Sequence, residues 1–192
     1  MTVLVVATGN PGKVKELQVY LDGLGWELRP KPDALEVEET GATFMENACL
    51  KASQIAQAVG EWAIADDSGL EVQALQGSPG VYSARYGSSD HDRIQRLLDE
   101  LGSTSNRAAQ FVCAIAVARP DGTIALQTEG YCLGEILTVP QGIGGFGYDP
   151  IFYVPEHRLT FAEMPPELKR QVSHRGKALE LLFPQLRALE QK

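Results

Sequence analysis

The chain has 192 residues, of which 44% are hydrophobic and 22% are charged, as is usual for a folded protein with a sizeable core. Its formal net charge of -8 at pH 7 argues against general binding to nucleic acid or to an anionic membrane surface. We therefore expect a single domain over residues 1–192, with neither a nucleic acid nor a membrane as its partner.

The three cysteines indicate a reducing compartment. Cys49, Cys113 and Cys132 are odd in number and lack CxxC spacing, so neither a disulfide framework nor a zinc site is expected. No apolar run approaches the roughly 20 residues of a membrane-spanning helix. Together these features predict free thiols and a cytoplasmic protein.

The N-terminal segment combines a strand with a candidate phosphate-binding loop. Val3–Ala7 is apolar and β-branched, as in a buried strand, and Thr8–Lys13 follows it directly. Asn10 suits a helix N-cap and Pro11 suits the first helical position. The backbone N–H groups of Gly12 and Lys13, together with the Lys13 ammonium, then form a cradle for phosphate. The alternative is a plain strand-to-helix turn with a solvated lysine. The loop does not match the Walker A pattern, which disfavours a P-loop ATPase or kinase.

An acidic stretch follows a connector that is interrupted by prolines. Leu28–Glu36 contains two prolines and is predicted to be extended rather than helical. Beyond it, Glu38 is a candidate metal ligand, although an acidic cluster is usually a solvated face. The sequence leaves both interpretations open.

The first long helix has a clear start and a small polar face. Thr43 and Glu46 match a capping box, which predicts a helix that runs to about Val59. Asn47 and Lys51 lie four residues apart on one face of this helix. Their amide and ammonium groups either bind a phosphate chain or are simply exposed to solvent.

Two adjacent carboxylates stand at the end of an apolar strand. Trp62–Ala65 is predicted to be this strand, Asp66 and Asp67 follow it, and Leu70–Leu75 alternates like a second strand. Two neighbouring carboxylates repel each other and are tolerated most easily when a cation or a proton lies between them. We therefore expect the chemistry of the protein at this point.

The middle of the chain supplies scaffold elements. Asp90–Leu101 is predicted to be an amphipathic helix that Gly102 stops, and Val81–Tyr86 before it is expected to be a loop. Ala109–Arg119 and Thr123–Tyr131 form the clearest hairpin of the sequence.

A glycine-rich loop, Gly142–Gly147, literally satisfies the GxGxxG pattern. It is followed by a proline-containing turn rather than by a helix, so we reject a dinucleotide site. The loop presents Phe146, Tyr148 and Asp149, which suit stacking on and hydrogen bonding to a flat heterocycle. The alternative, that the aromatic residues are core anchors, stays open.

The C-terminal part places basic residues at an unusual position. A short helical turn is expected after a pair of prolines, with Lys169 near its end, and Ser173 is predicted to cap the last helix. His174 and Arg175 fall in the first turn of that helix, where cations oppose the helix dipole. Such a local violation often marks a site that binds anions or carbonyl oxygens. Pro184 is expected to kink or end the helix.

Taken in order, several segments resemble the motif series of one family. The segments are Thr8–Lys13, Glu38–Gly41 with Glu46–Ala48, Ala65–Gly69, Pro79–Arg85, Phe146–Pro150 and Ser173–Arg175. Together they resemble the bacterial form of the inosine triphosphate pyrophosphatases, also called non-canonical purine nucleotide pyrophosphatases or XTP/dITP diphosphohydrolases. The resemblance covers nearly the whole chain.

The resemblance implies an activity and a fold. Members of the family hydrolyse dITP, ITP and XTP to the monophosphate and pyrophosphate in preference to ATP and GTP, which cleanses the nucleotide pool. The implied fold is an α/β fold with an elongated mixed β-sheet, flanking helices and two lobes around a central substrate cleft. Mg²⁺ dependence and a homodimer are implied as well.

The same resemblance assigns roles to residues. Asp67 would be the general base and, with Glu38, a ligand of Mg²⁺. Contacts to a purine nucleotide would come from Thr8, Gly9, Asn10, Pro11, Gly12, Lys13, Lys51, Ser68, Phe146, Gly147, Tyr148, Asp149, Lys169, His174 and Arg175. Two alternatives remain, namely a house-cleaning pyrophosphatase that prefers another modified base and a nucleotide-binding regulator without catalysis.

Overall fold

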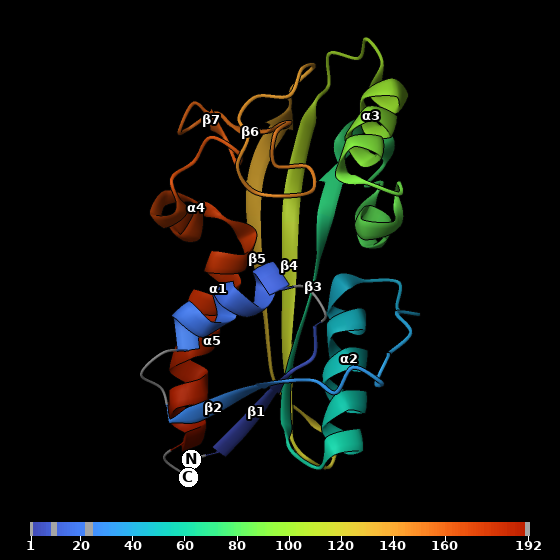
Figure 1. Cartoon of the computed structure of the whole chain (residues 1–192). Helices are drawn as coiled ribbons and strands as arrows, with labels where there is room; N and C mark the ends of the chain where they lie inside the picture. Colours follow the sequence, from blue (N-terminus) through green and yellow to red (C-terminus); the bar gives the residue numbers. More distant parts are fainter. Residues whose placement is uncertain (1, 9–10, 22–24, 191–192) are drawn as a thin grey trace. The chain divides into compact units, whose positions relative to one another are not determined.

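A computed structural model describes residues 2–8, 11–21 and 25–190. Within these residues, strands and helices alternate up to β4 (Ala108–Ala118), after which three more strands and then two helices follow (Figure 1). In chain order they are β1 (Thr2–Val6), α1 (Pro11–Leu21), β2 (Trp26–Pro30), α2 (Phe44–Val59), β3 (Trp62–Val72), the 3-10 helices η1 (Gln73–Leu75) and η2 (Gly80–Arg85), α3 (Asp90–Leu101), β4 (Ala108–Ala118), β5 (Ile124–Ile136), β6 (Phe152–Val154), β7 (Leu159–Thr160), α4 (Pro166–Val172) and α5 (His174–Glu190).

The strands belong to one mixed sheet in the order β2-β1-β3-β4-β5-β6-β7. β1 pairs in parallel with both β2 and β3, whereas β6 pairs antiparallel with β5 and β7. This arrangement confirms the expected α/β fold with a mixed sheet and flanking helices. The elongated shape and the cleft between two lobes stay predictions.

The chain forms two compact units, which are called unit 1 and unit 2 below. Unit 1 comprises Met1–Asp67, Cys113–Glu129 and Ala178–Lys192, and unit 2 comprises Ser68–Val112 and Gly130–Lys177. The chain passes from one unit to the other within β3, β4, β5 and α5. Each unit has its own hydrophobic core.

In unit 1, helices α1 and α2 cover opposite faces of β1 and β3. α1 connects β1 to β2 on one side of β1, and α2 leads back from β2 to β3 on the other side. Crossovers between parallel strands are right-handed as a rule, and these two run in opposite directions across the sheet, so their helices lie on opposite faces (Figure 1). Successive side chains of a strand also point to opposite faces, so neighbouring residues of β3 face different helices.

The core of unit 1 holds these helices against the sheet. Leu4 of β1 and Ile64 of β3 are fully buried, and Leu17 and Leu21 of α1 pack in the same cluster. On α2 the buried face consists mainly of alanine, with Ala48, Ala52 and Ala56 at 0% exposure. Such small side chains bring the backbone of α2 close to the strands.

The connector predicted between the first two helices contains a strand that the sequence analysis missed. Trp26–Pro30 forms β2 and pairs with β1 in a register that places Trp26 beside Thr2. Trp26 is buried and its ring meets that of Trp62 edge-on at 5.5 Å. The prolines that suggested irregular structure stand at and beyond the end of this edge strand, where proline is tolerated.

β3 differs from its prediction because it is continuous. The expected break at residues 66–69 is wrong: the strand runs for 11 residues from Trp62 to Val72. Its end also comes earlier than predicted, because Gln73–Leu75 forms a 3-10 turn rather than strand. The expected loop at Val81–Tyr86 is largely helical, since Gly80–Arg85 forms η2 and its Ser83 hydroxyl accepts the N–H of Leu70 at 2.9 Å.

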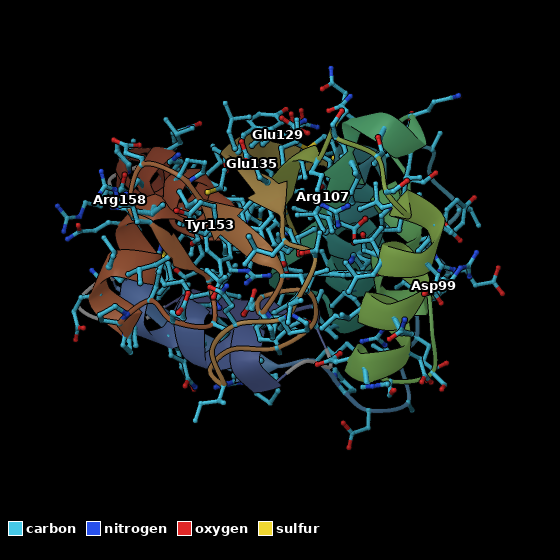
Figure 2. All side chains as sticks on the ribbon, turned by 90° about the horizontal axis from the view of Figure 1, so that it is seen from above. Asp99, Arg107, Glu129, Glu135, Tyr153 and Arg158 are labelled. Atoms are coloured by element: carbon cyan, nitrogen blue, oxygen red, sulfur yellow. The ribbon has the colours of Figure 1, made fainter. Side chains whose placement is uncertain are left out.

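The hairpin is confirmed, and β5 extends further than expected, to Ile136. The N–H of Arg119 donates to the carbonyl oxygen of Thr123 at 2.9 Å across its turn. At the other end of the hairpin, Arg107 (labelled in Figure 2) donates from Nε to the carbonyl oxygen of Ile136 at 2.5 Å and from Nη2 to that of Leu137 at 3.2 Å. Arg107 therefore fixes the chain where β4 begins and β5 ends.

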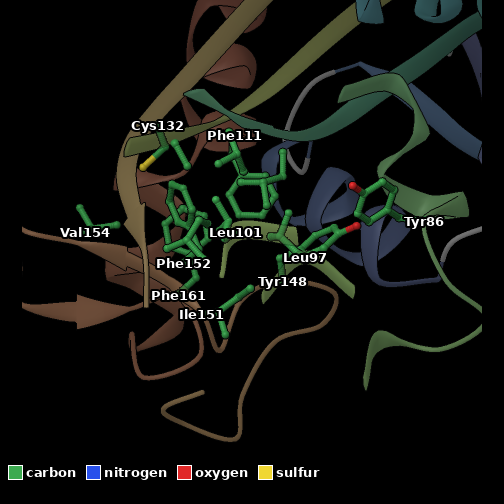
Figure 3. Close-up of a cluster of buried hydrophobic side chains, with 14 of the residues drawn as sticks. Tyr86, Leu97, Leu101, Phe111, Cys132, Tyr148, Ile151, Phe152, Val154 and Phe161 are labelled. Atoms are coloured by element: carbon green, nitrogen blue, oxygen red, sulfur yellow. The ribbon is translucent and has the colours of Figure 1, made fainter. Parts of the chain in front are cut away.

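The core of unit 2 is rich in aromatic rings (Figure 3). The ring of Phe111 on β4 lies 4.5 Å from that of Phe152 on β6 and 5.6 Å from that of Phe161. Leu97 and Leu101 anchor α3 in the same cluster, which confirms the predicted helix and its stop at Gly102. The strands β6 and β7, of three and two residues, were not predicted because such short segments carry no periodic pattern.

The two C-terminal helices are confirmed apart from one detail. α4 carries Lys169 near its end, and the Ser173 hydroxyl accepts the N–H of Gly176 at 3.1 Å at the start of α5. Of the two outcomes expected at Pro184, the end of the helix is wrong and a kink stays a prediction: α5 continues to Glu190, with Leu182 and Leu186 buried on either side of the proline. None of the helices formed by the described residues is long and apolar enough to cross a membrane.

The capping box of α2 gives a first test of the fold. The Thr43 hydroxyl accepts the N–H of Glu46 at 3.1 Å, and the Glu46 carboxylate accepts the N–H of Thr43 at 3.1 Å. Thr43→Ala should lower the free energy of unfolding by about 1 kcal/mol, because the N–H of Glu46 loses the hydroxyl that accepts it. Urea unfolding measures the change, with the exposed Thr40→Ala as the control that should not shift the midpoint. Equal midpoints for Thr43→Ala and the unmodified chain would contradict this expectation.

Candidate active site

The adjacent carboxylates on β3 point to opposite faces of the sheet, and each meets a lysine from the helix that covers its face. On the α1 side, Lys13 Nζ lies 2.9 Å from Asp66 Oδ2, and the side chains are only 16% and 2% exposed. On the α2 side, Lys51 Nζ lies 3.4 Å from Asp67 Oδ1. Each of the two carboxylates therefore has an ammonium group of its own beside it.

The α2 side carries a connected polar cluster. The amide of Asn47 donates to Asp67 Oδ2 at 3.1 Å, and Asn47 is fully buried. Asn47 Oδ1 accepts the N–H of Gly41 at 2.7 Å. This hydrogen bond holds the acidic stretch Glu38–Gly41 next to Asn47. Lys51 reaches that stretch as well, because its Nζ lies 2.7 Å from Glu39 Oε1. The alternative that Asn47 and Lys51 are simply exposed to solvent is therefore wrong.

Burial and charge pull the pKa values of this cluster in different directions. Burial raises the pKa of Asp67, the Lys51 ammonium opposes that rise, and the Glu39 carboxylate adds to it, so that the pKa ends above the ordinary value. For Lys51, burial lowers the pKa, but the surrounding carboxylates of Asp67, Asp66 and Glu39 outweigh it. Asp67 is thus a carboxylate with an increased affinity for a proton, beside a lysine that stays charged.

The neighbouring glutamates of the acidic stretch, Glu38 and Glu39, have different surroundings. Glu39, which the sequence analysis did not select, is the residue that pairs with Lys51. Glu38 is exposed, and its role as a metal ligand stays a prediction. Among the side chains that the structure describes, no group of three or more His, Cys, Asp or Glu residues forms a ready-made metal cluster.

The predicted phosphate loop is only partly described. Thr8 is half-buried, and α1 begins at Pro11, as expected from the sequence. Gly9 and the predicted cap Asn10 lie outside the described residues. Lys13 lies in the first turn of α1, as expected. The phosphate-binding cradle itself stays a prediction.

A second group of the predicted residues gathers in unit 2 around Asp149. Its Oδ2 accepts Lys169 Nζ at 2.6 Å and the N–H of Phe146 at 2.9 Å. Burial raises the pKa of Asp149, although Lys169 opposes this effect. Lys169 also lies 5.4 Å from the centre of the Phe146 ring, which is 43% exposed. The carboxylate therefore fixes both a cation and the backbone that carries an exposed aromatic ring.

The two aromatic residues of the glycine loop have different surroundings. Tyr148 is buried and its hydroxyl donates to the carbonyl oxygen of Ser83 at 2.9 Å, so it is a core anchor. Phe146 remains exposed. A Cβ at Gly145, where φ is +74°, would lie 1.9 Å from Asp149 Oδ2, so this turn requires glycine.

His174 and Arg175 are buried at the start of α5. The His174 ring stacks on that of Phe111, with centroids 4.7 Å apart and an angle of 12° between the planes. Arg175 Nη2 donates to the hydroxyl of Ser68 at 3.1 Å. These contacts fix the plane of the imidazole and the direction of the guanidinium.

Comparison with known proteins identifies the family. The sequence profile of the Ham1 family matches residues 4–185, which is nearly the whole chain. The chain belongs to the Ham1 family. A dITP/XTP pyrophosphatase of a Nostoc species is 67% identical over 97% of this chain and 95% of its own length. A Synechocystis protein of the same name is 60% identical over 96% of this chain and 95% of its own length.

Solved structures agree with this Ham1 assignment. The Ham1 protein of Coxiella burnetii matches with a TM-score of 0.91 and 42% identity, and each chain is covered completely. A nucleoside-triphosphatase/dITP/XTP pyrophosphatase of Mycobacterium abscessus matches with a TM-score of 0.78 and 42% identity over 97% of this chain and all of its own. The family resemblance stated from the motifs is therefore confirmed.

In this Ham1 chain the residues expected from the motifs thus form two groups. Lys13, Lys51 and Asp67 belong to unit 1. The second group, in unit 2, consists of Ser68, Phe146, Gly147, Tyr148, Asp149, Lys169, His174 and Arg175. Asn47 and Glu39 join the first group as residues whose role the sequence did not reveal.

Proposed function

We propose that this Ham1 chain hydrolyses non-canonical purine nucleoside triphosphates, namely dITP, ITP and XTP, to the monophosphate and pyrophosphate. The observation that carries the proposal is the buried Asp67, whose pKa is raised and which lies beside the charged Lys51. A base for water and a cation for phosphate are what hydrolysis of a phosphoanhydride requires. The relatives named dITP/XTP pyrophosphatases support the same class of substrate.

The side chains of unit 1 suit the phosphates. A triphosphate carries roughly four negative charges, which must be offset before water can attack it. Lys13 and Lys51 supply two ammonium groups, and the segment from Thr8 to Gly12 is proposed to add backbone N–H donors.

The donor set is compatible with Mg²⁺. This ion prefers carboxylate oxygens and is commonly held by one or two carboxylates together with substrate phosphates. Asp67 offers such oxygens at the centre of the cluster, and Glu38 is proposed as its partner because Glu39 is already engaged by Lys51. When bound, the ion would offset phosphate charge and polarise the phosphoryl oxygens.

Asp67 is proposed to accept a proton from the attacking water. The water oxygen forms a bond to the α-phosphorus, the bond from this phosphorus to the bridging oxygen breaks, and pyrophosphate leaves with that oxygen. The raised pKa of Asp67 increases its strength as a base relative to an exposed aspartate. Asn47 holds one carboxylate oxygen in place, which leaves the orientation of the base fixed before substrate arrives.

The side chains of unit 2 suit the base and the sugar. Phe146 offers an exposed ring for stacking, and Arg175 offers donors to a keto oxygen at the purine six-position. The amino group of adenine cannot accept such a donor, and this mismatch costs about 1 to 3 kcal/mol. The remaining contacts are proposed for Ser68, Gly147, Tyr148, Asp149, Lys169 and His174.

The domain organisation, oligomeric state and cellular location of the enzyme are also part of the proposal. We propose that residues 1–192 act as one pyrophosphatase domain and that two copies form a homodimer. A cytoplasmic location is supported by the three cysteines, which are all free thiols.

A substrate panel tests the proposed function. With Mg²⁺ present, the protein should release pyrophosphate from dITP and XTP about 10- to 100-fold faster than from ATP, because one lost hydrogen bond in the base pocket gives a ratio of this size. Coupled detection of pyrophosphate and of orthophosphate distinguishes the products. Orthophosphate as the main product would contradict the proposal, and a preference for another modified base would identify a different house-cleaning enzyme. Binding without turnover would identify a regulator.

A further inference from the structure

The loop that carries Phe146 is held by two carboxylates on consecutive backbone groups. The N–H of Phe146 donates to Asp149 Oδ2 at 2.9 Å. The next N–H, that of Gly147, donates to Asp90 Oδ2 at 2.7 Å. Asp149 belongs to the motif that carries Phe146, whereas Asp90 lies 57 residues earlier in the chain.

Asp90 is attached to a rigid element. It is the first residue of α3, whose N-cap Ser89 accepts the N–H of Asp92 at 3.1 Å. The second oxygen of Asp90 accepts Arg93 Nη1 at 2.6 Å, which fixes the carboxylate. Because Leu97 and Leu101 anchor α3 in the core of unit 2, the position of Asp90 is set by packing.

The backbone beside Phe146 requires such a restraint. Gly145 and Gly147 flank the residue with φ values of 74° and 61°, a region that glycine enters and leaves easily. The segment from Thr138 to Phe146 contains neither helix nor strand. Without external hydrogen bonds, the Phe146 ring would sample many orientations, and ordering it on binding would cost free energy.

We propose that Asp90 is a positioning residue for nucleotide selection: by holding the N–H of Gly147 it fixes the aromatic ring of Phe146 in the orientation that stacks on the purine. This inference rests on the proposed function, in which Phe146 contacts the base. Asp90 itself touches no reacting atom. Its removal should therefore weaken binding of the nucleotide and leave the chemical step nearly unchanged.

The chain offers a matched control two residues away. Asp92 is an exposed aspartate in the same helical turn, and it hydrogen-bonds Ser88 rather than the loop. Asp90→Ala and Asp92→Ala each remove one carboxylate from the start of α3 and so lose the same favourable interaction with the helix dipole. Asp90→Ala also loses the contacts to Arg93 and Gly147, so it should lower the melting temperature more. Only Asp90→Ala removes the restraint on Gly147.

Kinetics and hydrogen exchange test the proposal together. Asp90→Ala should raise KM for ITP about tenfold, the equivalent of about 1.4 kcal/mol, with kcat within about twofold of the unmodified enzyme. Asp90→Asn, which keeps an acceptor of the same shape without the charge, should show a smaller rise, and Asp92→Ala should show none. Exchange of the amide hydrogen of Gly147 should accelerate in Asp90→Ala but not in Asp92→Ala.

A double-mutant cycle separates positioning from general damage. In a Phe146→Ala background the further change Asp90→Ala should have no additional effect on KM, because there is no ring to orient. Additive effects in the cycle, or a loss in kcat rather than in KM, would overturn the proposal. If the unmodified protein fails to hydrolyse ITP, the proposed function is at fault, and the hydrogen-exchange comparison still decides whether Asp90 restrains the loop.

Discussion

Asp67→Asn should reduce the rate of pyrophosphate release from dITP by about 10² to 10⁴-fold while the fold stays intact. An amide cannot accept the proton of the attacking water, so the loss should appear in kcat. The stability should change little, because asparagine has the shape of aspartate and burial already disfavours the charged form of Asp67. Lys51 also keeps a carboxylate partner in Glu39.

The measurement is steady-state kinetics combined with urea unfolding. Asp99→Asn is the matched control, since it makes the same chemical change at an exposed position of α3 (labelled in Figure 2). The control should retain full activity. Unimpaired turnover in Asp67→Asn would rule out this residue as the base, and a large loss of stability would show that its charge serves the fold instead.

The second large effect concerns Lys13. Lys13→Met should lower the free energy of unfolding by about 3 kcal/mol, because it leaves the carboxylate of Asp66 buried without its ammonium partner. The same change should reduce kcat/KM for dITP by about 100-fold, since a charged contact to phosphate is lost. Urea unfolding and initial rates report the two losses independently.

A double variant distinguishes these two roles of Lys13. Lys13→Met combined with Asp66→Asn removes both charges of the pair, so most of the lost stability should return. Activity should not return, because the phosphate contact is still missing. Recovery of activity together with stability would mean that Lys13 serves only the fold. Asp66, whose purpose the sequence left open, would in either case be the residue that holds this lysine.

The outline of the fold could be predicted because its signals are local. The capping box at Thr43 and the amphipathic pattern of Asp90–Leu101 depend on residues within a few positions of each other. β2 was missed because Pro30 and Pro32 suggested irregular structure, whereas the strand is defined by its pairing with β1, which is distant in sequence. The break predicted in β3 failed for a related reason, since the lysines that neutralise its two carboxylates come from two different helices.

The candidate site was predictable as a set of residues but not as a set of contacts. The motifs pointed to Asp67, Lys51 and Lys169, and the structure gives each of them an ionic partner. No local pattern distinguishes Glu39 from Glu38, because the choice depends on which side chain reaches a lysine 12 residues away. For Asn47 the sequence left open whether the amide binds phosphate or is exposed to water, because its partner Asp67 lies 20 residues later in the chain.

Each of the lysines at the candidate site is paired with carboxylates of the chain itself. Lys13 pairs with Asp66, Lys51 with Glu39 and Asp67, and Lys169 with Asp149. A phosphate oxygen that takes the ammonium group of Lys13 or Lys51 would have to displace an acid, so the proposed binding of phosphate is an exchange of partners. The gain is the difference between two sets of ionic contacts, which is much smaller than either set alone. Such an exchange would keep the affinity for anions modest and would let the phosphate-bearing products leave as the carboxylates return to their lysines.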